Sequence, residues 1–151
     1  MHKTATSVPS RFRYYLLVTL AAAGCVVATY LALYQMGIVA AVWEPLFGDG
    51  SRIILRSSLA RSLPVPDAAI GAVAYLVEFL CATVRWTERA RNVWVERAYY
   101  ALVVTFTVGS MLLVALQWGY FHAWCTLCLT SALLSFIVAG VVISEFRARR
   151  G

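Results

Sequence analysis

Four long apolar runs constrain this chain more than any other feature of its sequence. They cover residues 14–42, 68–84, 99–118 and 125–144. A helix needs about 20 residues to cross a hydrocarbon layer of roughly 30 Å, and each run approaches or exceeds that length. The chain is 62% hydrophobic and only 13% charged, too apolar to cover itself with polar groups as a soluble domain does. The sequence therefore predicts an all-α integral membrane four-helix bundle that lies in the lipid bilayer.

The basic residues predict the orientation of this bundle. Ten of the 13 lie before the first run, between the second and third, or after the fourth, and three lie in the first loop. The positive-inside rule then puts both termini in the cytoplasm. We predict a cytoplasmic tail at 1–13, a membrane domain at 14–144 and a second cytoplasmic tail at 145–151. Because the charges flank apolar runs and do not line one face, they do not indicate nucleic-acid binding.

The first extracytoplasmic loop is predicted to hold a short amphipathic helix at 51–63, lying on the membrane surface. Its apolar and basic positions recur at helical spacing: Ile54, Leu55 and Leu59 beneath Arg52 and Arg56. Asp49 is suited to cap its start, and Pro64 to end it. In the first span, Gly24, Ala28 and Ala32 recur every four residues, which predicts close packing against another helix.

Cys125 and Cys128 are the two cysteines with a diagnostic spacing. At the start of a helix, residues three apart share a face, and their sulfurs lie close enough to bridge. Cys125 falls at the helix N-terminus, where free N–H groups favour a thiolate, so the sequence predicts a lowered pKa and an exposed nucleophile. His122 has two interpretations: a positive charge beside Cys125, or an interfacial residue that solvates the turn.

A second interpretation of the pair is packing alone, since free cysteine packs like a small apolar residue. The helix start, the outward-facing depth and the flanking Trp124 favour a redox pair instead. Cys25 and Cys81 lie deeper in their spans, away from an oxidising space, and are predicted to be packing residues. We predict no metal site.

Glu78 is a carboxylate inside the second apolar run. Such a group is costly in a membrane unless it is paired, protonated or near the interface. Two interpretations stay open: an ion pair with Arg85, two helical turns later, or a role in handling protons.

Several elements occur together in a recognisable order: Tyr30-Leu31, residues 48–58, Pro66 followed by Gly71 and Tyr75, and Trp124-Cys125-Thr126-Leu127-Cys128. In order and spacing they resemble the bacterial vitamin K epoxide reductase and DsbB-like membrane thiol oxidoreductases. The resemblance covers most of residues 24–140. It implies a protein of the bacterial plasma (inner) membrane.

The resemblance also implies a function and a site. In this family a four-helix bundle surrounds a quinone, here menaquinone or ubiquinone, with the C-x-x-C pair beside it. Electrons from a thiol partner would enter at Cys125 and leave through Cys128. The residues implied for the quinone pocket are Cys128, Ser57, Tyr75 and Leu55.

The chain departs from the family pattern in the first outer loop, where members usually carry a second cysteine pair. Ser51 stands at the second of these positions, and Trp43 or Glu44 stands near the first. Ala132 replaces a tyrosine whose hydroxyl holds the quinone in some members. A thioredoxin-like extracytoplasmic protein or a second membrane subunit would then have to supply the thiols.

The leading hypothesis is a membrane thiol–disulfide oxidoreductase that passes electrons between an extracytoplasmic thiol partner and a quinone through the C-x-x-C pair. The alternative is a non-catalytic membrane scaffold or complex subunit that retains the fold. A small transporter subunit using Glu78 is a third hypothesis. Four spans with one buried carboxylate and no broken helix do not favour it.

Overall fold

The computed structural model describes residues 11–57, 64–86 and 93–150, and its long elements are helices. In chain order these are α1 (Arg11–Gln35), the short α2 (Gly50–Leu55), α4 (Asp67–Trp86), α5 (Val93–Leu116), the π-helical turn η2 (Gln117–Phe121) and α6 (Thr126–Arg150). Within the described ranges, four helical segments are long and apolar enough to cross a membrane. The prediction of an all-α membrane bundle with a short helix between its first two spans is confirmed.

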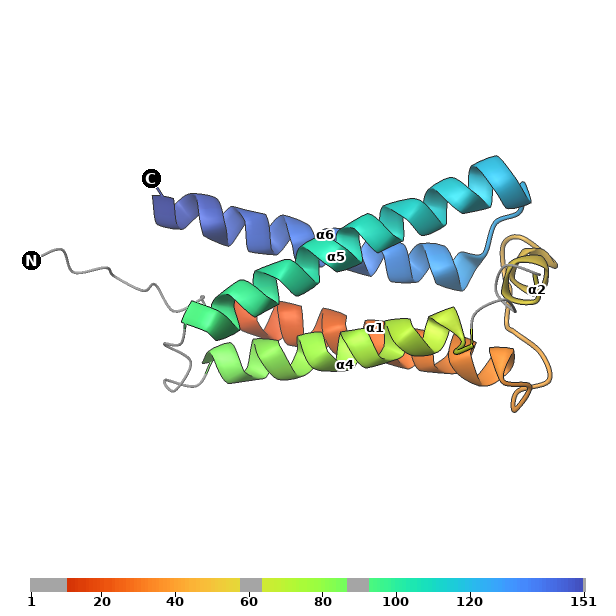
Figure 1. Ribbon diagram of the computed structural model, residues 1–151, viewed down its shortest axis with the longest axis horizontal. Coiled ribbons are helices and arrows are strands. Elements are labelled where there is room, and N and C mark those ends of the chain that lie inside the picture. The colour runs from red at the N-terminus through yellow and green to blue at the C-terminus, as the bar shows by residue number, and fades with distance from the viewer. Residues whose placement is uncertain (1–10, 58–63, 87–92, 151) are drawn as a thin grey trace, which may run out of the picture.

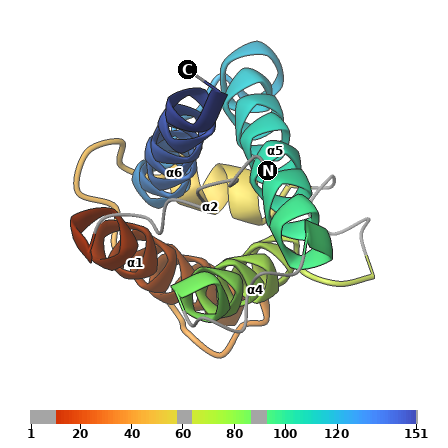
Figure 2. The same ribbon diagram turned by 90° about the vertical axis from the view of Figure 1, so that its left-hand side faces the viewer.

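The four long helices form a ring, seen end-on in Figure 2, in which α1 lies beside α4 and α6 while α5 completes the circle. Figure 1 shows α2 at one end of the bundle, which we call the loop end. The start of α1 and the end of α6 lie at the other, the terminal end. Large apolar side chains remain exposed on the outer faces of the helices, as lipid contact requires; examples are Val26, Val73, Leu80, Val104, Leu112, Leu133 and Ile143.

The first helix ends earlier than the apolar run predicts. Gly37 adopts a left-handed φ of +76°, and its N–H donates to the Tyr34 carbonyl at 3.0 Å. The N–H of Ile38 donates to the Leu33 carbonyl, also at 3.0 Å. These two bonds form a Schellman cap, which satisfies the last carbonyls of a helix. The helix therefore stops at Gln35, and the apolar residues up to position 42 belong to the loop before α2.

Small residues on α1 allow close packing against α4, as predicted. Gly24, Ala28 and Ala32 are all buried. A Cβ atom at Gly24 would overlap the ring of Tyr75, and one at Gly71 would lie 3.8 Å from Ala28 Cβ. The α1–α4 contact is the most extensive helix pairing among the described residues.

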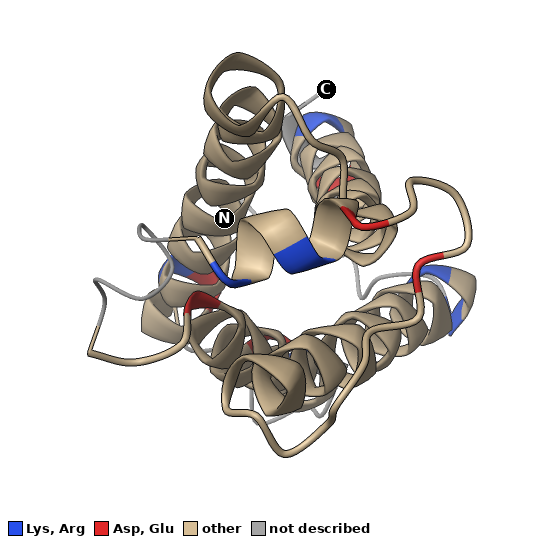
Figure 3. Ribbon diagram, turned by 90° about the vertical axis from the view of Figure 1, so that its right-hand side faces the viewer, with Lys and Arg blue, Asp and Glu red and all other residues tan. Residues whose placement is uncertain are grey.

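The short helix α2 crosses the loop end of the bundle (Figure 3). Ile54 and Leu55 are buried while Arg52 is exposed, so its predicted amphipathic character is confirmed. It ends at Leu55, whereas the predicted helix continues to 63; residues 58–63 of that prediction, with Leu59 among them, lie outside the described residues. Asp49 occupies the N-cap position but makes no side-chain capping bond.

The terminal end contains an ion-pair cluster around Arg85 that does not include Glu78, in contrast to the first of the two interpretations of Glu78. The Arg85 guanidinium lies 3.2 Å from Glu145 Oε2 on α6 and 4.0 Å from Glu96 Oε1 on α5. It also stacks over the Tyr99 ring, 4.5 Å from its centroid. Within the described part of the chain Arg85 makes no ion pair with Glu78, because its side chain turns toward α5 and α6 and not back along α4.

Candidate functional site

Cys125 and Cys128 form a disulfide at the loop end, with their Cα atoms 5.2 Å apart. Cys125 stands at the N-cap position of α6, and its sulfur accepts the backbone N–H of Cys128 at 3.1 Å. A serine oxygen commonly takes this place at a helix start. The pair is therefore held by the first turn of α6, as its spacing predicts.

The turn that leads into Cys125 is shaped by a π-helical end of α5. Gln117 begins this turn, and its side-chain oxygen accepts the Cys125 N–H at 3.1 Å. His122 follows in a left-handed conformation with φ of 46°, and its Nδ1 lies 2.7 Å from the Trp118 carbonyl oxygen. His122 is exposed and engaged with the turn, which agrees with the second interpretation of this residue.

Cys125 is completely buried, with an exposed fraction of 0%. The sequence predicts an exposed nucleophile, and the difference arises because α2 covers the sulfur. Ser51 Oγ lies 3.1 Å from Cys125 Sγ. Gly50 approaches the Trp124 backbone so closely that a Cβ atom there would overlap the Trp124 carbonyl oxygen. An incoming thiol therefore cannot reach Cys125 unless α2 moves.

Glu44 connects the loop before α2 to the start of α6. Its carboxylate accepts the Thr126 N–H at 3.1 Å and also bonds the hydroxyl groups of Thr126 and Ser51. Burial raises the pKa of Glu44, but the hydrogen bonds from Ser51 and Thr126 outweigh it, so the pKa lies below its ordinary value of 4.5. Glu44 is thus ionised at neutral pH and sits where the helix dipole of α6 favours a negative charge.

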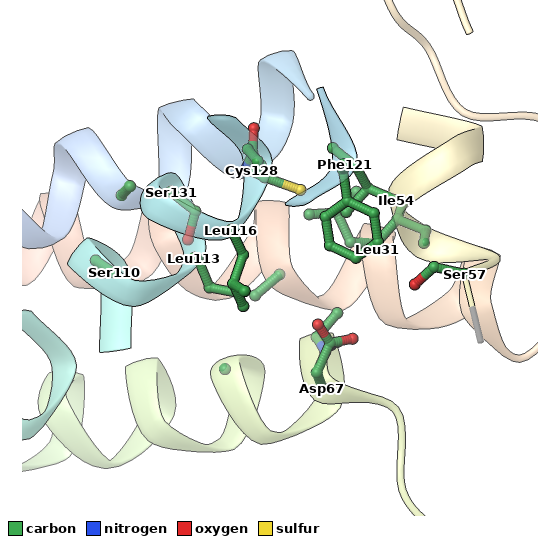
Figure 4. A pocket seen from close by; sticks show the side chains of 16 residues that line it. Leu31, Ile54, Ser57, Asp67, Ser110, Leu113, Leu116, Phe121, Cys128 and Ser131 are labelled. Atoms are coloured by element: carbon green, nitrogen blue, oxygen red, sulfur yellow. Dashed lines mark hydrogen bonds between the residues drawn. The ribbon is translucent and has the colours of Figure 1, made fainter. Parts of the chain in front are cut away.

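A cavity of about 400 Å³ opens between the helices beside the disulfide (Figure 4). Most of its wall is apolar, with contributions such as Leu31, Ile54, Leu113, Leu116 and Phe121. Polar groups interrupt this wall at a few places: Ser57, Asp67, Ser110, Gln117 and Ser131. Volume and lining are those of a small-molecule site with a few orienting polar groups.

The structure brings together three of the four residues that the resemblance implies for a quinone pocket. Cys128, Leu55 and Ser57 line the cavity, whereas Tyr75 does not. Tyr75 is 1% exposed, and its hydroxyl donates to the Ser131 carbonyl at 2.7 Å and contacts Ser135 Oγ at 2.8 Å. It therefore braces the part of α6 that carries Ser131.

Two site residues have roles that sequence reasoning missed. Gln117 lies near the end of the third apolar run, and Glu44 lies just beyond the end of the first. In each case the available signal was a polar side chain at the end of an apolar run. Their contacts with Cys125, Thr126 and Ser51 depend on how the loops fold back, which no local pattern reveals.

The other two cysteines are free and lie in α1 and α4. The Cys25 thiol contacts the Ala72 carbonyl oxygen at 3.6 Å. Cys81 packs against the apolar core of the terminal end. Both environments are those of packing residues.

The sequence model of the vitamin K epoxide reductase family matches residues 15–143. The chain belongs to this family. No curated protein matches the chain. Vitamin K epoxide reductase family proteins are typically thiol–disulfide oxidoreductases, and the C-x-x-C pair they use is present here as Cys125 and Cys128.

The departure of this family member in the first loop has a structural counterpart. Ser51, at the position of a loop cysteine in the pattern described above, directly contacts Cys125. Glu44, near the position of the other, bonds Ser51. Ser51 and Glu44 therefore form a hydrogen-bonded pair beside the Cys125–Cys128 disulfide.

Proposed function

We propose that this protein is a membrane thiol–disulfide oxidoreductase that passes electrons from an extracytoplasmic thiol partner to a quinone. The observation that carries the proposal is the Cys125–Cys128 disulfide at the edge of the 400 Å³ apolar cavity, with Cys128 in the cavity wall. A two-electron relay needs a disulfide that a protein thiol meets on one side and a small molecule meets on the other. Membership of the family supports the same assignment.

The cavity residues fit a quinone. Small side chains at Ala28, Gly71 and Ala132 leave room between the helices for a flat ring. The hydroxyl groups of Ser57 and Ser131 supply donors for quinone oxygens, and the apolar wall suits an isoprenoid tail. When bound, menaquinone or ubiquinone would accept two electrons and two protons.

The two cysteines take different parts in this reaction. A partner thiolate would attack Cys125 Sγ, breaking the disulfide and releasing Cys128 as the leaving thiolate. Cys128 then carries its electron pair on the side of the cavity, where it lines the wall. The N–H of Cys128 donates to Cys125 Sγ and holds this sulfur at the start of α6.

Thiol entry requires the covering helix to open. Cys125 is 0% exposed beneath Gly50 and Ser51, so a partner must displace α2 before exchange. A thioredoxin-like extracytoplasmic protein or a second membrane subunit would bind at the loop end and do this. We propose that the loop end faces outward in the bacterial plasma membrane and that both termini are cytoplasmic, since ten of 13 basic residues then lie inside.

Quinone-dependent oxidation of the purified protein tests the proposal. Protein in lipid nanodiscs is reduced with dithiothreitol, freed of reductant and mixed with menadione, and the Cys125–Cys128 bond is followed by thiol alkylation and mass spectrometry. We expect rapid closure of this disulfide with stoichiometric formation of menadiol. The matched control is Cys25→Ser with Cys81→Ser, which removes the two free thiols and leaves the reaction unchanged.

Two results contradict the proposal. The first is a reduced pair that menadione does not reoxidise while a general thiol oxidant does. The second is a pair that stays reduced in oxidising native membranes.

The burial of Cys125 favours a second candidate function, a non-catalytic scaffold or complex subunit. In that role the disulfide only ties the first turn of α6. Changing both Cys125 and Cys128 to serine would then leave assembly and phenotype intact, whereas the oxidoreductase loses its function.

A further inference from the structure

Ser51 lies between the reactive sulfur and a carboxylate. Its Oγ is 3.1 Å from Cys125 Sγ and hydrogen-bonds Glu44 Oε2. A hydroxyl carries one proton, and an ionised carboxylate accepts it better than sulfur does. The Ser51 oxygen therefore presents its lone pairs to Cys125. In the reduced protein, the Cys125 S–H can donate to Ser51, and the three groups form a continuous chain.

The burial of Cys125 calls for a base. Cys125 is 0% exposed, and burial disfavours the charged form of a thiol. The Thr126 N–H at the start of α6 already donates to Glu44, so this donor does not serve Cys125. Reduced Cys125 therefore needs a proton acceptor to become a nucleophile.

Glu44 has a route to water on its other side. A second cavity, of about 290 Å³, is lined by Glu44 and Ser51 together with Tyr34, Asp49 and Arg52. Asp49 and Arg52 lie at the exposed surface and pair with each other at 3.6 Å. A proton that reaches Glu44 can therefore leave to the solvent without crossing the apolar cavity beside Cys128.

We propose that Glu44 and Ser51 form a proton relay that deprotonates Cys125 when the disulfide closes. Ser51 is the catalytic residue, since it touches the reacting sulfur, and Glu44 is a positioning residue that acts through it. The proposal deepens the function proposed above and rests on it. It gives a role to Ser51, which stands at the position of one loop cysteine of the family pattern, and to Glu44, which stands near the position of the other.

Closure of the disulfide moves two electrons and two protons. The Sγ–Sγ bond between Cys125 and Cys128 forms, and two electrons pass to the quinone. The proton of Cys125 moves to Ser51 Oγ as the Ser51 proton moves to Glu44. Glu44 then releases this proton to water through the second cavity, and Cys128 loses its own proton on the side of the first cavity. A bound quinone would take up two protons, one from Cys128 and one from water, so the protons lost and gained are equal. During reduction by a partner, the same path returns a proton to Cys125.

The charged groups around Glu44 define the controls for a pH experiment. Tyr34 on α1, Asp49 before α2 and Arg52 on α2 face the same cavity, and Cys125 faces Ser51. Because Asp49 lines this cavity, the control carboxylate comes from the other end of the bundle: Glu96→Gln removes a partly exposed carboxylate that lines neither cavity. It is the matched control for Glu44→Gln.

The test measures the rate of Cys125–Cys128 closure from about pH 5 to 9 with menadione and, in parallel, with diamide, an oxidant that needs no quinone site. We expect Glu44→Gln and Ser51→Ala each to slow closure by on the order of 100-fold at neutral pH, the usual contribution of a general base. The rate should recover above the pH where Cys125 ionises unaided. Glu96→Gln should follow the wild-type profile.

The combined Glu44→Gln and Ser51→Ala variant distinguishes a relay from a simple charge effect. In a relay the second change adds nothing once the chain is broken, so the double variant matches either single one. Ser51→Ala leaves the Glu44–Thr126 bonds in place, so it tests the relay even where Glu44→Gln loosens the fold. Circular dichroism and gel filtration of each variant check that fold.

Several outcomes overturn the relay: unchanged rates in both variants, an equal loss in Glu96→Gln, or a loss that is the same at every pH, which indicates a structural role. Failure of the proposed function looks different. Menadione then fails with the wild-type protein, while the pH profile with diamide still separates the variants.

Discussion

The two ends of the bundle each bury a polar cluster, and the clusters are built in different ways. At the terminal end, Arg85, Glu96 and Glu145 come from three regular helices and pair by charge. At the loop end, Glu44 and Ser51 come from a loop and a short helix and bind the start of α6 through hydrogen bonds. The first arrangement ties long helices together, whereas the second positions one sulfur atom.

The two clusters therefore contribute to different properties of the protein. A buried ion pair between helices restricts how they pack, and removing one partner leaves an uncompensated charge. A network of hydroxyl and carboxylate groups around a sulfur affects its protonation and its access to solvent. We therefore expect variants at the terminal end to change stability, and variants at the loop end to change redox chemistry as well.

The largest loss of stability is expected for Arg85→Ala. It leaves Glu145, whose side chain is 4% exposed, as a buried charge without its partner, which costs about 3–5 kcal/mol. Unfolding by sodium dodecyl sulfate in mixed micelles, followed by circular dichroism, measures the loss. The rate of disulfide closure in the protein that remains folded should be unchanged.

The matched control for this variant is Arg97→Ala, since Arg97 is exposed and stacks on Trp94 alone among the contacts described. A change within about 0.5 kcal/mol is expected there. Equal losses in the two variants would mean that the buried cluster does not hold the helices together.

The next largest effect is expected for Gly50→Ala at the loop end. The added Cβ overlaps the Trp124 carbonyl oxygen, a backbone atom that cannot rotate away, so the cost approaches 3 kcal/mol, about the upper end for overpacking. Because α2 must shift, Cys125 should also become accessible to a maleimide reagent after reduction. Gly119→Ala is the control, since a Cβ there meets nothing within 4 Å.

A smaller loss of stability is expected for Gly24→Ala, at a position between the two ends of the bundle. Its Cβ overlaps the Tyr75 ring, and that ring is held by Ser131 and Ser135. We expect about 1–2 kcal/mol of destabilisation, measured by the same unfolding titration. Gly140→Ala meets nothing within 4 Å and should be neutral or slightly stabilising; a similar loss there would point to helix propensity and not to the ring.

The smallest expected effect is a loss of stability in acid, which comes from Glu44 at the loop end. The pKa of Glu44 is lowered in the folded protein, so its ionised form stabilises the fold above about pH 4.5, and this contribution disappears as pH falls through the folded value. Thermal unfolding at neutral pH and at about pH 3 should therefore show a larger acid loss in the wild type than in Glu44→Gln. An identical loss in both would show that the hydrogen bonds of Glu44 do not stabilise the fold.

Much of the fold was predictable from local patterns. Four apolar runs of spanning length, the amphipathic spacing around Ile54 and Leu55, and small residues from Gly24 to Ala32 each report on one helix and its surroundings. The C-x-x-C spacing predicted the pairing of Cys125 and Cys128 for the same reason, since both lie in one helical turn. The exact end of α1 was not predictable by hydropathy, because the cap at Gly37 interrupts an apolar run.

The membrane bundle, the C-x-x-C pair and the family pattern with its missing loop cysteines can be predicted from the sequence, because they depend on hydropathy and on spacing within single segments. Which charges meet and what covers the sulfur depend on the tertiary structure. Arg85 pairs with Glu145 across 60 residues of sequence, and Glu44 reaches Thr126 across 82. Such contacts depend on which helices are neighbours and on how loops fold back over their ends, and neither is written in a local pattern.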